Sequence, residues 1–461
     1  MIKTIILAAG EGTRMKSKLP KVLHNICGQP MINYVLDSAR GAGSEKNYII
    51  VGHGKDKVMD TITNEDIGYI DQPMGEGVPY GTGYAVMQAK EYIKDSDIVL
   101  ILCGDTPLLK GDTLNEFIKY HKKEKYDATV LTATIDNPKG YGRIIRGENG
   151  QVLGIVEEKD ASKDQKKVME INSGVYCFSG KHLKDALDRI DNNNAQREYY
   201  LTDTIKILND LGFSVGGFKI EDSTEINGIN SRIQLSNAEN IMRNRINEKL
   251  MSQGVTLIDP DNTYIHKMVK IGKDTVIYPN VFIEGSSTIG EDCTIGHNSK
   301  IVDSTIGDGV TINTSTILES TVGNNTSVGP YAYIRPQSHI GNNVKIGDFV
   351  EVKKSKIGNN TKASHLAYIG DAQVGDGVNI GCGVVFVNYN GKDKSKTIVE
   401  DGAFIGSNSN LVAPVTIKKK AYIAAGSTII DDVKEGDLSI ARARQVNKQG
   451  WVSKKNPYKN K

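Results

Sequence analysis

The sequence has no long hydrophobic run. None of its apolar stretches approaches the roughly 20 residues that a membrane-spanning helix needs, so no such helix is predicted. The first apolar stretch, residues 4–9, is also too short for the core of a signal peptide, and glycines and charges follow it from Gly10 to Arg14. We therefore interpret residues 4–9 as a buried strand that opens a folded domain.

Cysteines are few, and neither sign of charge predominates. The five cysteines are an odd number and none stands at Cys-x-x-Cys spacing, which argues against a disulfide framework and against a zinc site. This cysteine usage suits a reducing compartment, so a cytoplasmic protein is expected. The 57 Lys and Arg residues nearly balance the 55 Asp and Glu residues, for a net charge of +2. Such a balance gives no electrostatic reason to expect nucleic acid or an anionic membrane as a partner.

A length of 461 residues predicts two or more domains, because a single hydrophobic core rarely serves a chain this long. In residues 1–229, strand-like apolar segments alternate with segments of helical periodicity. The strand-like segments are residues 4–9, 48–51 and 98–103, and the helical ones are residues 30–39 and 82–93. Such alternation predicts an α/β, Rossmann-like domain with a mostly parallel sheet, whose ligands bind beyond the carboxyl ends of the strands.

A single helix is predicted to join this domain to the rest of the chain. Between Ser231 and Gly254 the apolar residues recur at helical spacing, with polar residues between them. Ser231 is suited to cap the start of a helix, and Gly254 is suited to end one. We assign residues 230–250 to this linker helix.

From residue 251 onward the hydrophobic period changes to six. The aliphatic residues at this spacing form three series: Ile271, Ile277, Ile283, Ile289, Ile295 and Ile301; Val322, Val328, Ile334, Ile340, Ile346 and Val352; and Val399, Ile405, Leu411, Ile417, Ile423 and Ile429. The period is typical of hexapeptide repeats, in which three units close one triangular coil and the aliphatic residue points inward. Residues 251–461 are therefore predicted to form a left-handed parallel β-helix with a C-terminal tail. An excursion interrupts the period between residues 384 and 396, and such loops often carry function.

The strongest local motif follows the first predicted strand. Gly10 and Gly12 allow backbone N–H groups to approach phosphate oxygens, since no Cβ stands in the way. Arg14 and Lys21 add positive charge where a triphosphate would lie. A glycine-rich turn alone would indicate only a tight turn, but here it occurs with both cations directly after a strand. The dinucleotide-binding fingerprint fits less well, because Met15 replaces its third glycine.

This loop resembles that of nucleotidyltransferases that activate sugar 1-phosphates, and later segments extend the resemblance. These segments are Gly81-Thr82-Gly83 at the start of a predicted helix, Gly104-Asp105 at the end of a predicted strand, and Gly228-Ile229-Asn230. The resemblance implies a Mg²⁺ ion held by Asp105 and Asn230, with Gln72 reading the base. It also implies contacts to UTP or the UDP-sugar from Leu7, Ala8, Ala9, Gly10, Lys21, Gln72, Gly81, Thr82, Cys103, Gly104, Asp105, Gly142, Glu157, Asn172 and Asn230.

Uridylyl transfer brings two polyanions together, because a sugar phosphate attacks the α-phosphorus of UTP while pyrophosphate departs. A Mg²⁺ ion together with Arg14 and Lys21 would offset the negative charge that develops. No general base is required, since the attacking phosphate oxygen is already ionised. Two simpler interpretations remain: Asp105 could cap a helix, and Asn172 could be only a turn residue.

A dense group of polar residues stands out within the predicted β-helix. Its members are Arg335, Lys353, His365, Tyr368 and Asn379, which fall within three coils. Acyl transfer to an amine needs a base for the ammonium proton and cations for any phosphate on the acceptor. His365 is the candidate base, and Arg335 and Lys353 form the candidate phosphate clamp. Glu351 is a candidate partner that would orient or polarise the site.

Over residues 1–451 the chain resembles the family of bifunctional UDP-N-acetylglucosamine pyrophosphorylases and glucosamine-1-phosphate N-acetyltransferases. Its most specific stretches are the first glycine loop, residues 362–371 and residues 411–416. The resemblance implies that His365 is the catalytic base and that the sugar phosphate is held by Arg335, Lys353, Tyr368 and Asn379. It implies acetyl-CoA contacts for Cys382, Asn388, Tyr389, Ser407, Ala425 and Arg442.

The resemblance also implies an order of reactions and an assembly. Glucosamine 1-phosphate is N-acetylated by the C-terminal domain and then uridylylated by the N-terminal domain, which supplies UDP-N-acetylglucosamine for cell-envelope precursors such as peptidoglycan. A homotrimer is expected, with coenzyme sites between neighbouring β-helices that the tail around Arg442 completes.

Some positions depart from the family's pattern. Residues 74–80 carry an insertion, Tyr84 stands where histidine is common, Cys103 replaces a tyrosine, and Cys382 replaces an alanine. The insertion leads us to expect looser selectivity for the nucleotide base. Two alternatives remain open: a nucleotidyltransferase whose β-helix only assembles or regulates the enzyme, and an acetyltransferase whose first domain is degenerate.

Overall fold

The computed structural model describes residues 1–458, and the chain divides into two compact units, Met1–Met242 (unit 1) and Arg243–Lys461 (unit 2). The boundary lies within helix α7 (Arg232–Ser252), in the segment where a linker helix is predicted. The domain bounds at residues 1–229, 230–250 and 251–461 stay predictions. Within residues 1–458, no helix combines the length and the hydrophobicity required to cross a membrane.

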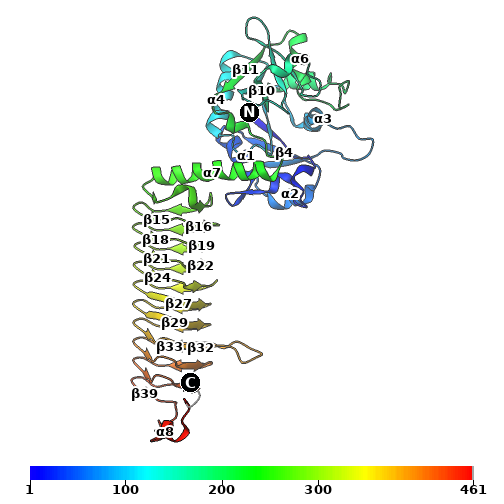
Figure 1. The fold of residues 1–461 in the computed structure, drawn as a ribbon. Helices are drawn as coiled ribbons and strands as arrows, with labels where there is room; N and C mark the ends of the chain where they lie inside the picture. Colours follow the sequence, from blue (N-terminus) through cyan, green and yellow to red (C-terminus); the bar gives the residue numbers. More distant parts are fainter. Residues whose placement is uncertain (459–461) are drawn as a thin grey trace. The chain divides into compact units, whose positions relative to one another are not determined.

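Unit 1 is built on a nine-stranded mixed sheet (Figure 1) with the main order β11-β7-β10-β6-β1-β4-β5. The strands are β1 (Ile2–Leu7), β4 (Lys46–Val51), β5 (Ile67–Asp71), β6 (Ile98–Cys103), β7 (Ala128–Thr134), β8 (Arg143–Arg146), β9 (Val152–Val156), β10 (Glu170–Ser179) and β11 (Val215–Ile220); β2 (Asn25–Ile26) and β3 (Gln29–Pro30) form a separate pair. β10 is antiparallel to its three partners β6, β7 and β8, while β6, β1, β4 and β5 are parallel. Because β1 and β6 pair directly, their carboxyl ends, Leu7 and Cys103, lie side by side.

The central strands form because their side chains are apolar on both faces. Ile5, Ile6, Leu100 and Ile101 are all almost completely buried, which is characteristic of parallel strands covered on both sides. The helices of this unit are α1 (Met31–Gly41), α2 (Lys55–Thr61), α3 (Thr82–Met87), α4 (Gly111–Glu124), α5 (Gly180–Leu187) and α6 (Asp203–Asp210). Side chains of α3, α5 and α6 join the core cluster that contains Ile5 and Ile101, and α1 packs against α4.

Unit 2 is a parallel β-helix whose short strands pair in register from coil to coil (Figure 1). One side of each coil belongs to a sheet of β14 (Lys270–Ile271), β17 (Thr288–Ile289), β20 (Thr305–Ile306), β23 (Thr321–Val322), β26 (His339–Ile340), β28 (Lys356–Ile357), β30 (Ala372–Val374), β33 (Thr397–Val399) and β36 (Val415–Ile417). The remaining strands are β12 (Thr256–Leu257), β13 (Thr263–Ile265), β15 (Val276–Ile277), β16 (Val281–Glu284), β18 (Thr294–Ile295), β19 (Lys300–Val302), β21 (Thr311–Ile312), β22 (Thr316–Leu318), β24 (Ser327–Val328), β25 (Tyr333–Ile334), β27 (Lys345–Lys353), β29 (Lys362–Gly370), β31 (Asn379–Ile380), β32 (Val385–Val387), β34 (Phe404–Ile405), β35 (Asn410–Val412), β37 (Tyr422–Ile423), β38 (Thr428–Ile429) and β39 (Leu438–Ser439).

The inward aliphatic residues stack one coil apart, as predicted. Ile283 pairs with Ile301, Ile301 pairs in turn with Ile317, and all three are fully buried. The second of these coils is shorter than the first, and such shortened turns explain why the six-residue period in the sequence breaks into separate series. The predicted fold class, an α/β Rossmann-like unit followed by a linking helix and a left-handed parallel β-helix of hexapeptide repeats, is confirmed.

The predicted excursion leaves the stack between β32 and β33 (Figure 1). Val374 pairs with Val399, whereas Ile357 pairs with Val374, so the coil that carries the excursion is clearly longer than the coil before it. An antiparallel bridge between Tyr389 and Lys394 closes the excursion as a hairpin-like loop. Beyond β39 the chain continues into a tail that contains the short helix α8 (Trp451–Lys455).

Candidate functional site

A cleft of about 280 Å³ opens in unit 1 beyond the carboxyl ends of β1 and β6, where open α/β sheets generally bind ligands. Its walls contain ten of the residues expected to contact the nucleotide: Leu7, Ala8, Ala9, Gly10, Lys21, Gln72, Gly81, Thr82, Cys103 and Asp105. Sequence reasoning missed four further wall residues, which are Val22, Tyr80, Ala85 and Glu198.

Lys21 lies between the two residues expected to bind metal. Its Nζ donates to Asp105 Oδ2 at 2.5 Å and to Asn230 Oδ1 at 3.1 Å. The ion pair is largely buried, with 16% of the Lys21 side chain and 17% of the Asp105 side chain exposed. The backbone N–H of Ile229 donates to the Asp105 carbonyl at 2.9 Å, which fixes the loop that carries Asn230 against the end of β6. The two side-chain oxygens therefore converge on one cation.

Arg14 stands apart from this cluster. It is exposed in the 3-10 turn η1 (Thr13–Met15) and is not part of the cleft wall. Gly104 instead joins the strand ends, since its backbone N–H donates to the Leu7 carbonyl at 2.9 Å. Gln72 is almost fully buried, and its backbone N–H donates to the Val51 carbonyl at 2.8 Å. This bond holds the chain at the point where Gln72 enters the cleft wall.

Gly142, Glu157 and Asn172 form a second group, at the β8–β9 hairpin and β10. The Asn172 N–H donates to the Gly142 carbonyl at 2.9 Å, and a Cβ on Gly142 would lie 3.5 Å from Glu157 Oε1. Glu157 accepts a hydrogen bond from the Thr202 hydroxyl at 3.2 Å. Burial raises the pKa of Glu157. The group presents a carboxyl and an amide side by side, which suits hydroxyl groups of a sugar.

A bulge in β10 connects the second group to the cleft. The pairing of β10 with β7 shifts between Asn172 and Tyr176, and such bulges commonly redirect side chains beside active sites. Gly174, inside the bulge, has a φ of 77°, and a Cβ there would lie only 2.9 Å from the Cys103 sulfur. Burial raises the pKa of Cys103 to about 12, so its thiol is neutral at physiological pH. Cys103 thus fills the space at the bulge without adding charge.

Gly81 marks a crossing of two distant segments. Its φ is 125°, and a Cβ on Gly81 would overlap the carbonyl oxygen of Tyr199. The Tyr199 N–H donates to the Tyr80 carbonyl, and the Gly83 N–H donates to the Tyr199 carbonyl, both at 2.8 Å. This crossing brings Glu198 into the cleft wall. No local motif announces Glu198, because its position depends on the contact between the two segments.

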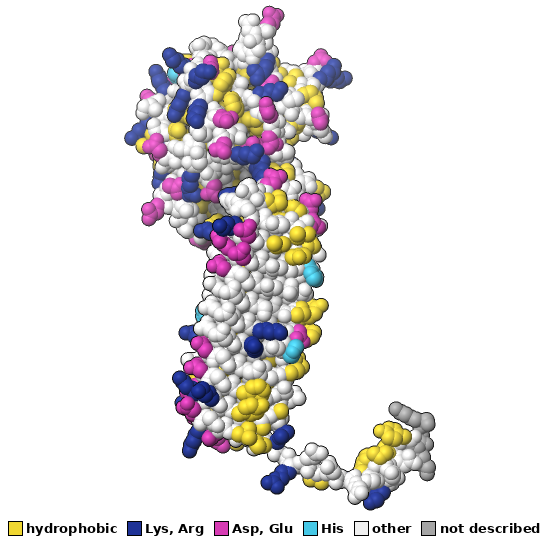
Figure 2. Space-filling view, turned by 90° about the vertical axis from the view of Figure 1, so that its left-hand side faces the viewer, with side chains coloured by type: hydrophobic (Ala, Val, Ile, Leu, Met, Phe, Trp, Pro, Cys, Tyr) yellow, Lys and Arg dark blue, Asp and Glu magenta, His cyan; other side chains and the backbone are white. Residues whose placement is uncertain are grey.

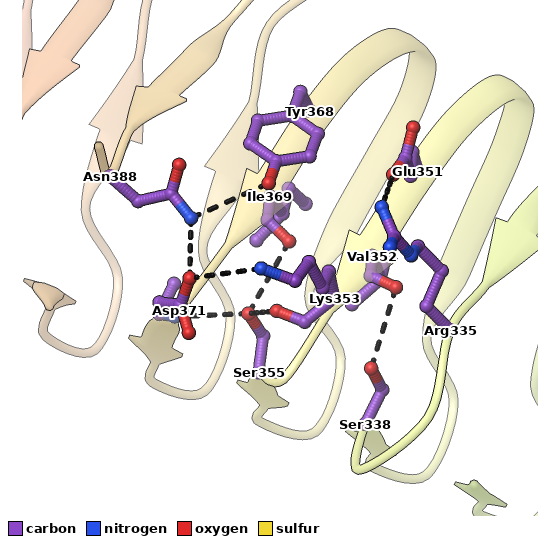
Figure 3. Close-up of polar contacts among 11 residues, drawn as sticks. Arg335, Ser338, Glu351, Val352, Lys353, Ser355, Tyr368, Ile369, Asp371 and Asn388 are labelled. Atoms are coloured by element: carbon purple, nitrogen blue, oxygen red, sulfur yellow. Dashed lines mark hydrogen bonds and ion pairs between the residues drawn. The ribbon is translucent and has the colours of Figure 1, made fainter. Parts of the chain in front are cut away.

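On unit 2, the side chains of Lys353, Tyr368, Asp371 and Asn388 converge from successive coils (Figure 3). Lys353 Nζ lies 3.4 Å from Asp371 Oδ2, and the Asn388 amide donates to the same carboxylate. The Asn388 amide also lies 3.4 Å from the Tyr368 hydroxyl. Lys394, on the excursion, was missed by sequence reasoning. A hydrogen bond between the two amines raises the pKa of Lys353 and lowers that of Lys394. Two adjacent amines favour an anionic ligand.

His365 is paired with Asp348. His365 Nδ1 lies 2.6 Å from Asp348 Oδ1, because β27 and β29 pair with these two residues in direct register. Glu351 instead accepts a hydrogen bond from Arg335 Nη1 at 2.8 Å. Glu351 thus contacts a predicted site residue, and its role in orienting or polarising the site stays a prediction. Asp348 and His365 are separated in the sequence by one coil. The pair could therefore be predicted only once the length of that coil is known.

Several residues expected to contact acetyl-CoA form a column along one corner of the β-helix. The column, one residue per coil, is His365, Cys382, Ser407 and Ala425. The Asn408 N–H donates to the Cys382 carbonyl at 2.7 Å, and the Gly426 N–H donates to the Ser407 carbonyl at 2.8 Å, which fixes the steps. A Cβ on Gly426 would lie 3.9 Å from Arg442 Cδ, so Arg442 stands at the far end.

Two further predicted residues lie elsewhere on unit 2. Asn379 pairs with Lys362 and Phe404, on the side of the coil that precedes the Tyr368 side. Tyr389 is exposed on the excursion, and its hydroxyl donates to the Gly391 carbonyl at 2.6 Å. On a single chain, these two side chains are therefore not part of the cluster around Lys353.

Comparisons with known proteins match both units. The Nucleotidyl transferase family model matches residues 3–220, and the bacterial transferase hexapeptide model matches residues 268–303 and 319–354. The bifunctional protein GlmU of Clostridioides difficile (strain 630) is 58% identical over 454 residues, which cover 98% of each chain. The proteins of the same name from Alkaliphilus oremlandii (strain OhILAs) and Geobacillus sp. (strain WCH70) are 55% and 52% identical, over 98% and 99% of this chain and 98% of each relative.

These relatives match nearly the whole chain, and both family models fall on the units that the structure separates. The chain belongs to the family of bifunctional GlmU proteins.

Proposed function

We propose that the chain is a bifunctional enzyme. Its C-terminal unit N-acetylates glucosamine 1-phosphate with acetyl-CoA. Its N-terminal unit then transfers UMP from UTP to N-acetylglucosamine 1-phosphate, giving UDP-N-acetylglucosamine, a precursor of the cell envelope, and pyrophosphate. The observation that carries this proposal is that each unit holds its own polar cluster, one at the strand ends of unit 1 and one on the coils of unit 2.

In the acetyl transfer, His365 is the general base. Asp348 occupies Nδ1, which orients the ring and leaves Nε2 to take a proton from the ammonium of glucosamine 1-phosphate. The hydrogen bond from His365 lowers the pKa of Asp348, so this carboxylate is ionised at neutral pH. The freed amine bonds to the acetyl carbon and the carbon–sulfur bond breaks. The nitrogen then gives up a second proton, and the departing coenzyme thiolate takes it.

The other predicted residues of unit 2 bind the two substrates. Arg335, Lys353, Tyr368 and Asn379 hold the phosphate and the sugar, with Lys394 as an added cation. Acetyl-CoA contacts Cys382, Asn388, Tyr389, Ser407, Ala425 and Arg442. Three coil steps separate His365 from Ala425, which amounts to about 14 Å at the usual strand spacing. The corner column therefore has the length scale of an extended pantetheine arm, with the thioester placed at His365.

In the uridylyl transfer, Arg14 and Lys21 offset charge on the triphosphate, and Gln72 reads the base. The glycine loop from Leu7 to Gly10 contacts the phosphates through backbone N–H groups. Gly142, Glu157 and Asn172 hold the sugar, beside Cys103 and Thr82 in the cleft. Charge compensation is the main requirement, since the attacking phosphate carries no proton to remove.

Asp105 and Asn230 would hold a Mg²⁺ ion. Their oxygens already converge on the Lys21 ammonium, so the pair fits a single cation. In residues 1–458, no three His, Cys, Asp or Glu side chains gather as a metal site. Two protein oxygens are nevertheless typical of Mg²⁺ sites in which phosphate oxygens and water complete the shell. When bound, the ion stabilises charge that develops on the α-phosphate and on the departing pyrophosphate.

We expect a cytoplasmic homotrimer. Three exposed apolar side chains, Tyr331, Phe349 and Leu366, occupy one corner of consecutive coils, and the rings of Tyr331 and Phe349 stack 5.4 Å apart. Figure 2 shows such apolar patches along the solenoid. Phe349 and Leu366 directly follow Asp348 and His365 in the sequence. A neighbouring chain that covers this corner would also cover the base, which supports coenzyme sites between chains.

Looser base selectivity also stays a proposal. The inserted residues 74–80 border a cavity of about 510 Å³, and Tyr80 belongs both to this cavity and to the nucleotide cleft. Comparable rates of pyrophosphate release with UTP and other nucleoside triphosphates would support looser selectivity. Strict dependence on UTP would contradict it.

The test of the bifunctional proposal is mass spectrometry of products from glucosamine 1-phosphate, acetyl-CoA, UTP and Mg²⁺. The wild type should give UDP-N-acetylglucosamine. His365→Ala should give none unless N-acetylglucosamine 1-phosphate is supplied, while His297→Ala, an exposed histidine on an earlier coil, should behave as the wild type. If His365→Ala makes the acetylated product at the wild-type rate, the β-helix only assembles or regulates a nucleotidyltransferase.

A further inference from the structure

The Lys21 ammonium occupies the position that the metal proposal assigns to Mg²⁺. Its Nζ lies 2.5 Å from Asp105 Oδ2 and 3.1 Å from Asn230 Oδ1, and these are the two oxygens that would bind the ion. Two cations cannot share these oxygens at such distances without strong repulsion. Binding of the metal therefore requires Lys21 to move.

We propose that Lys21 is a placeholder for the metal: without nucleotide it holds Asp105 and Asn230 together and excludes a divalent cation, and nucleotide phosphates draw it away. This inference rests on the proposed uridylyl transfer and concerns the order in which its ligands bind. In the enzyme so arranged, metal binds together with the nucleoside triphosphate and only weakly before it. Lys21 is in this respect a positioning residue for the metal site.

The need for a placeholder follows from burial. Asp105 is 17% exposed, and a carboxylate removed from water to this degree is costly unless a cation or hydrogen bonds compensate it. The Lys21 ammonium, 2.5 Å from Asp105 Oδ2, supplies this compensation.

The stem of Lys21 lies where the ammonium can reach either partner. A Cβ on Gly12, in the phosphate-binding turn, would lie 2.7 Å from Lys21 Cβ, so the stem already packs against that turn. Rotation about side-chain bonds can thus carry Nζ from Asp105 toward phosphates bound at the turn. A triphosphate brings more negative charge than one carboxylate, and it also contributes oxygen ligands for the metal. Both effects favour the exchange.

The test measures Mn²⁺ binding to the full-length protein without nucleotide, by electron paramagnetic resonance of free Mn²⁺. The wild type should bind weakly at this site. Lys21→Met, which keeps the stem and removes the charge, should bind about ten- to a hundredfold more tightly, as expected for loss of one charged hydrogen-bonding competitor. Lys21→Arg, which keeps the charge, should stay weak. Lys55→Met, which removes the exposed partner of Asp71, controls for net charge.

The outcomes separate this inference from the function on which it rests. If Lys21→Met and Lys55→Met bind Mn²⁺ as weakly as the wild type, Lys21 is not a placeholder, even where Mg²⁺-dependent pyrophosphate release is intact. Tight binding by the nucleotide-free wild type would overturn the inference without any variant, and tight binding by Lys21→Arg, which keeps the charge, would overturn it as well. Failure of the wild type to release pyrophosphate from UTP in any metal would instead refute the proposed uridylyl transfer.

Discussion

The two candidate sites differ most in how far water reaches their charges. In unit 1 the Lys21–Asp105 pair is 16% and 17% exposed, and it lies in a cleft that one compact unit forms by itself. In unit 2 the Arg335–Glu351 pair is 39% and 36% exposed, and the His365 side chain is 61% exposed. The charged side chains of unit 1 therefore lie in an enclosed cleft, whereas those of a single β-helix lie on an open surface. A solenoid places side chains at regular intervals but has no second wall of its own.

The units also differ in how the backbone fixes the site. Unit 1 depends on crossings between distant segments, such as the contact of Gly81 with Tyr199. Unit 2 depends on the repetition of one coil, so neighbouring residues of its site are separated in the sequence by a single coil. A change at a crossing should therefore damage unit 1 more than a comparable change at a turn damages unit 2.

Substitution of Asp105 is the strongest test of whether the two sites work independently. Asp105→Ala should lower the rate of pyrophosphate release about 10³-fold, because it removes a carboxylate that we propose holds Mg²⁺, and loss of that ion would cost several kcal/mol of transition-state stabilisation. Acetyl-CoA consumption should stay at the wild-type rate. Both rates are measured on one preparation, with Asp71→Ala, an exposed partner of Lys55, as the control. Parallel loss of both activities would show that the sites depend on each other.

Two glycines test the comparison between the segment crossing in unit 1 and the turns in unit 2. Gly81→Ala should lower the free energy of unfolding of unit 1 by about 2–4 kcal/mol, because its positive φ and the Tyr199 carbonyl both oppose a side chain. Gly377→Ala, on the β-helix, also has a positive φ, but a Cβ there meets no atom of the described chain within 4 Å, so it should cost about 1 kcal/mol. Chemical denaturation measures both, and equal losses would contradict the comparison.

A smaller effect is expected from the carboxylate that orients His365. Asp348→Asn should lower kcat of acetyl transfer about tenfold and leave KM for glucosamine 1-phosphate nearly unchanged, since the general base as a whole contributes 10²–10⁴-fold. Glu351→Gln should mainly raise that KM, because Glu351 contacts Arg335. Steady-state kinetics give both constants, and Asp348→Glu should restore part of kcat. If Asp348→Asn changes only KM, Asp348 does not orient His365 as the base.

The same carboxylate sets a pH expectation. The hydrogen bond from His365 lowers the pKa of Asp348 below its ordinary value of 3.8, so the ionised form is favoured in the folded protein. Its stabilising effect is present above the ordinary pKa and is lost only as the pH falls through the lowered pKa. Protonation of Asp348 should therefore not limit kcat between pH 8 and about pH 5, which the pH profile of kcat for acetyl transfer tests.

The smallest expected effect is the difference between exposed and buried charges in their response to salt. Raising NaCl from about 0.05 M to about 0.5 M should raise KM for glucosamine 1-phosphate about two- to fivefold, because exposed charges are screened at these ionic strengths. KM for UTP, whose cleft holds the buried Lys21–Asp105 pair, should change less. Both are measured in the same buffers. An equal rise in both KM values would contradict this expectation. It would indicate that the response to salt does not depend on how exposed the charges of the free site are.

Periodic features of this protein could be predicted from its sequence. The step of six from residue 251 onward predicted the β-helix, and the alternation in residues 1–229 predicted the α/β unit. The helix predicted over residues 82–93 is shorter: it splits into α3 (Thr82–Met87) and the 3-10 turn η3 (Lys90–Tyr92). The reason is local, since the N–H groups of Gln88 and Ala89 bond three residues back and tighten the helix end.

The sequence alone therefore determined local features. These are the alternation of strands with helices, the extent of the hexapeptide period, and the glycines, cations and carboxylates that follow strands. Only the tertiary structure decided which side chains meet. It paired His365 with Asp348 and Glu351 with Arg335, brought Glu198 to the cleft, and placed Lys21 between Asp105 and Asn230. The physical reason is that periodicity follows from burial of each segment's own apolar face, whereas these contacts depend on strand register and on crossings between residues far apart in the chain.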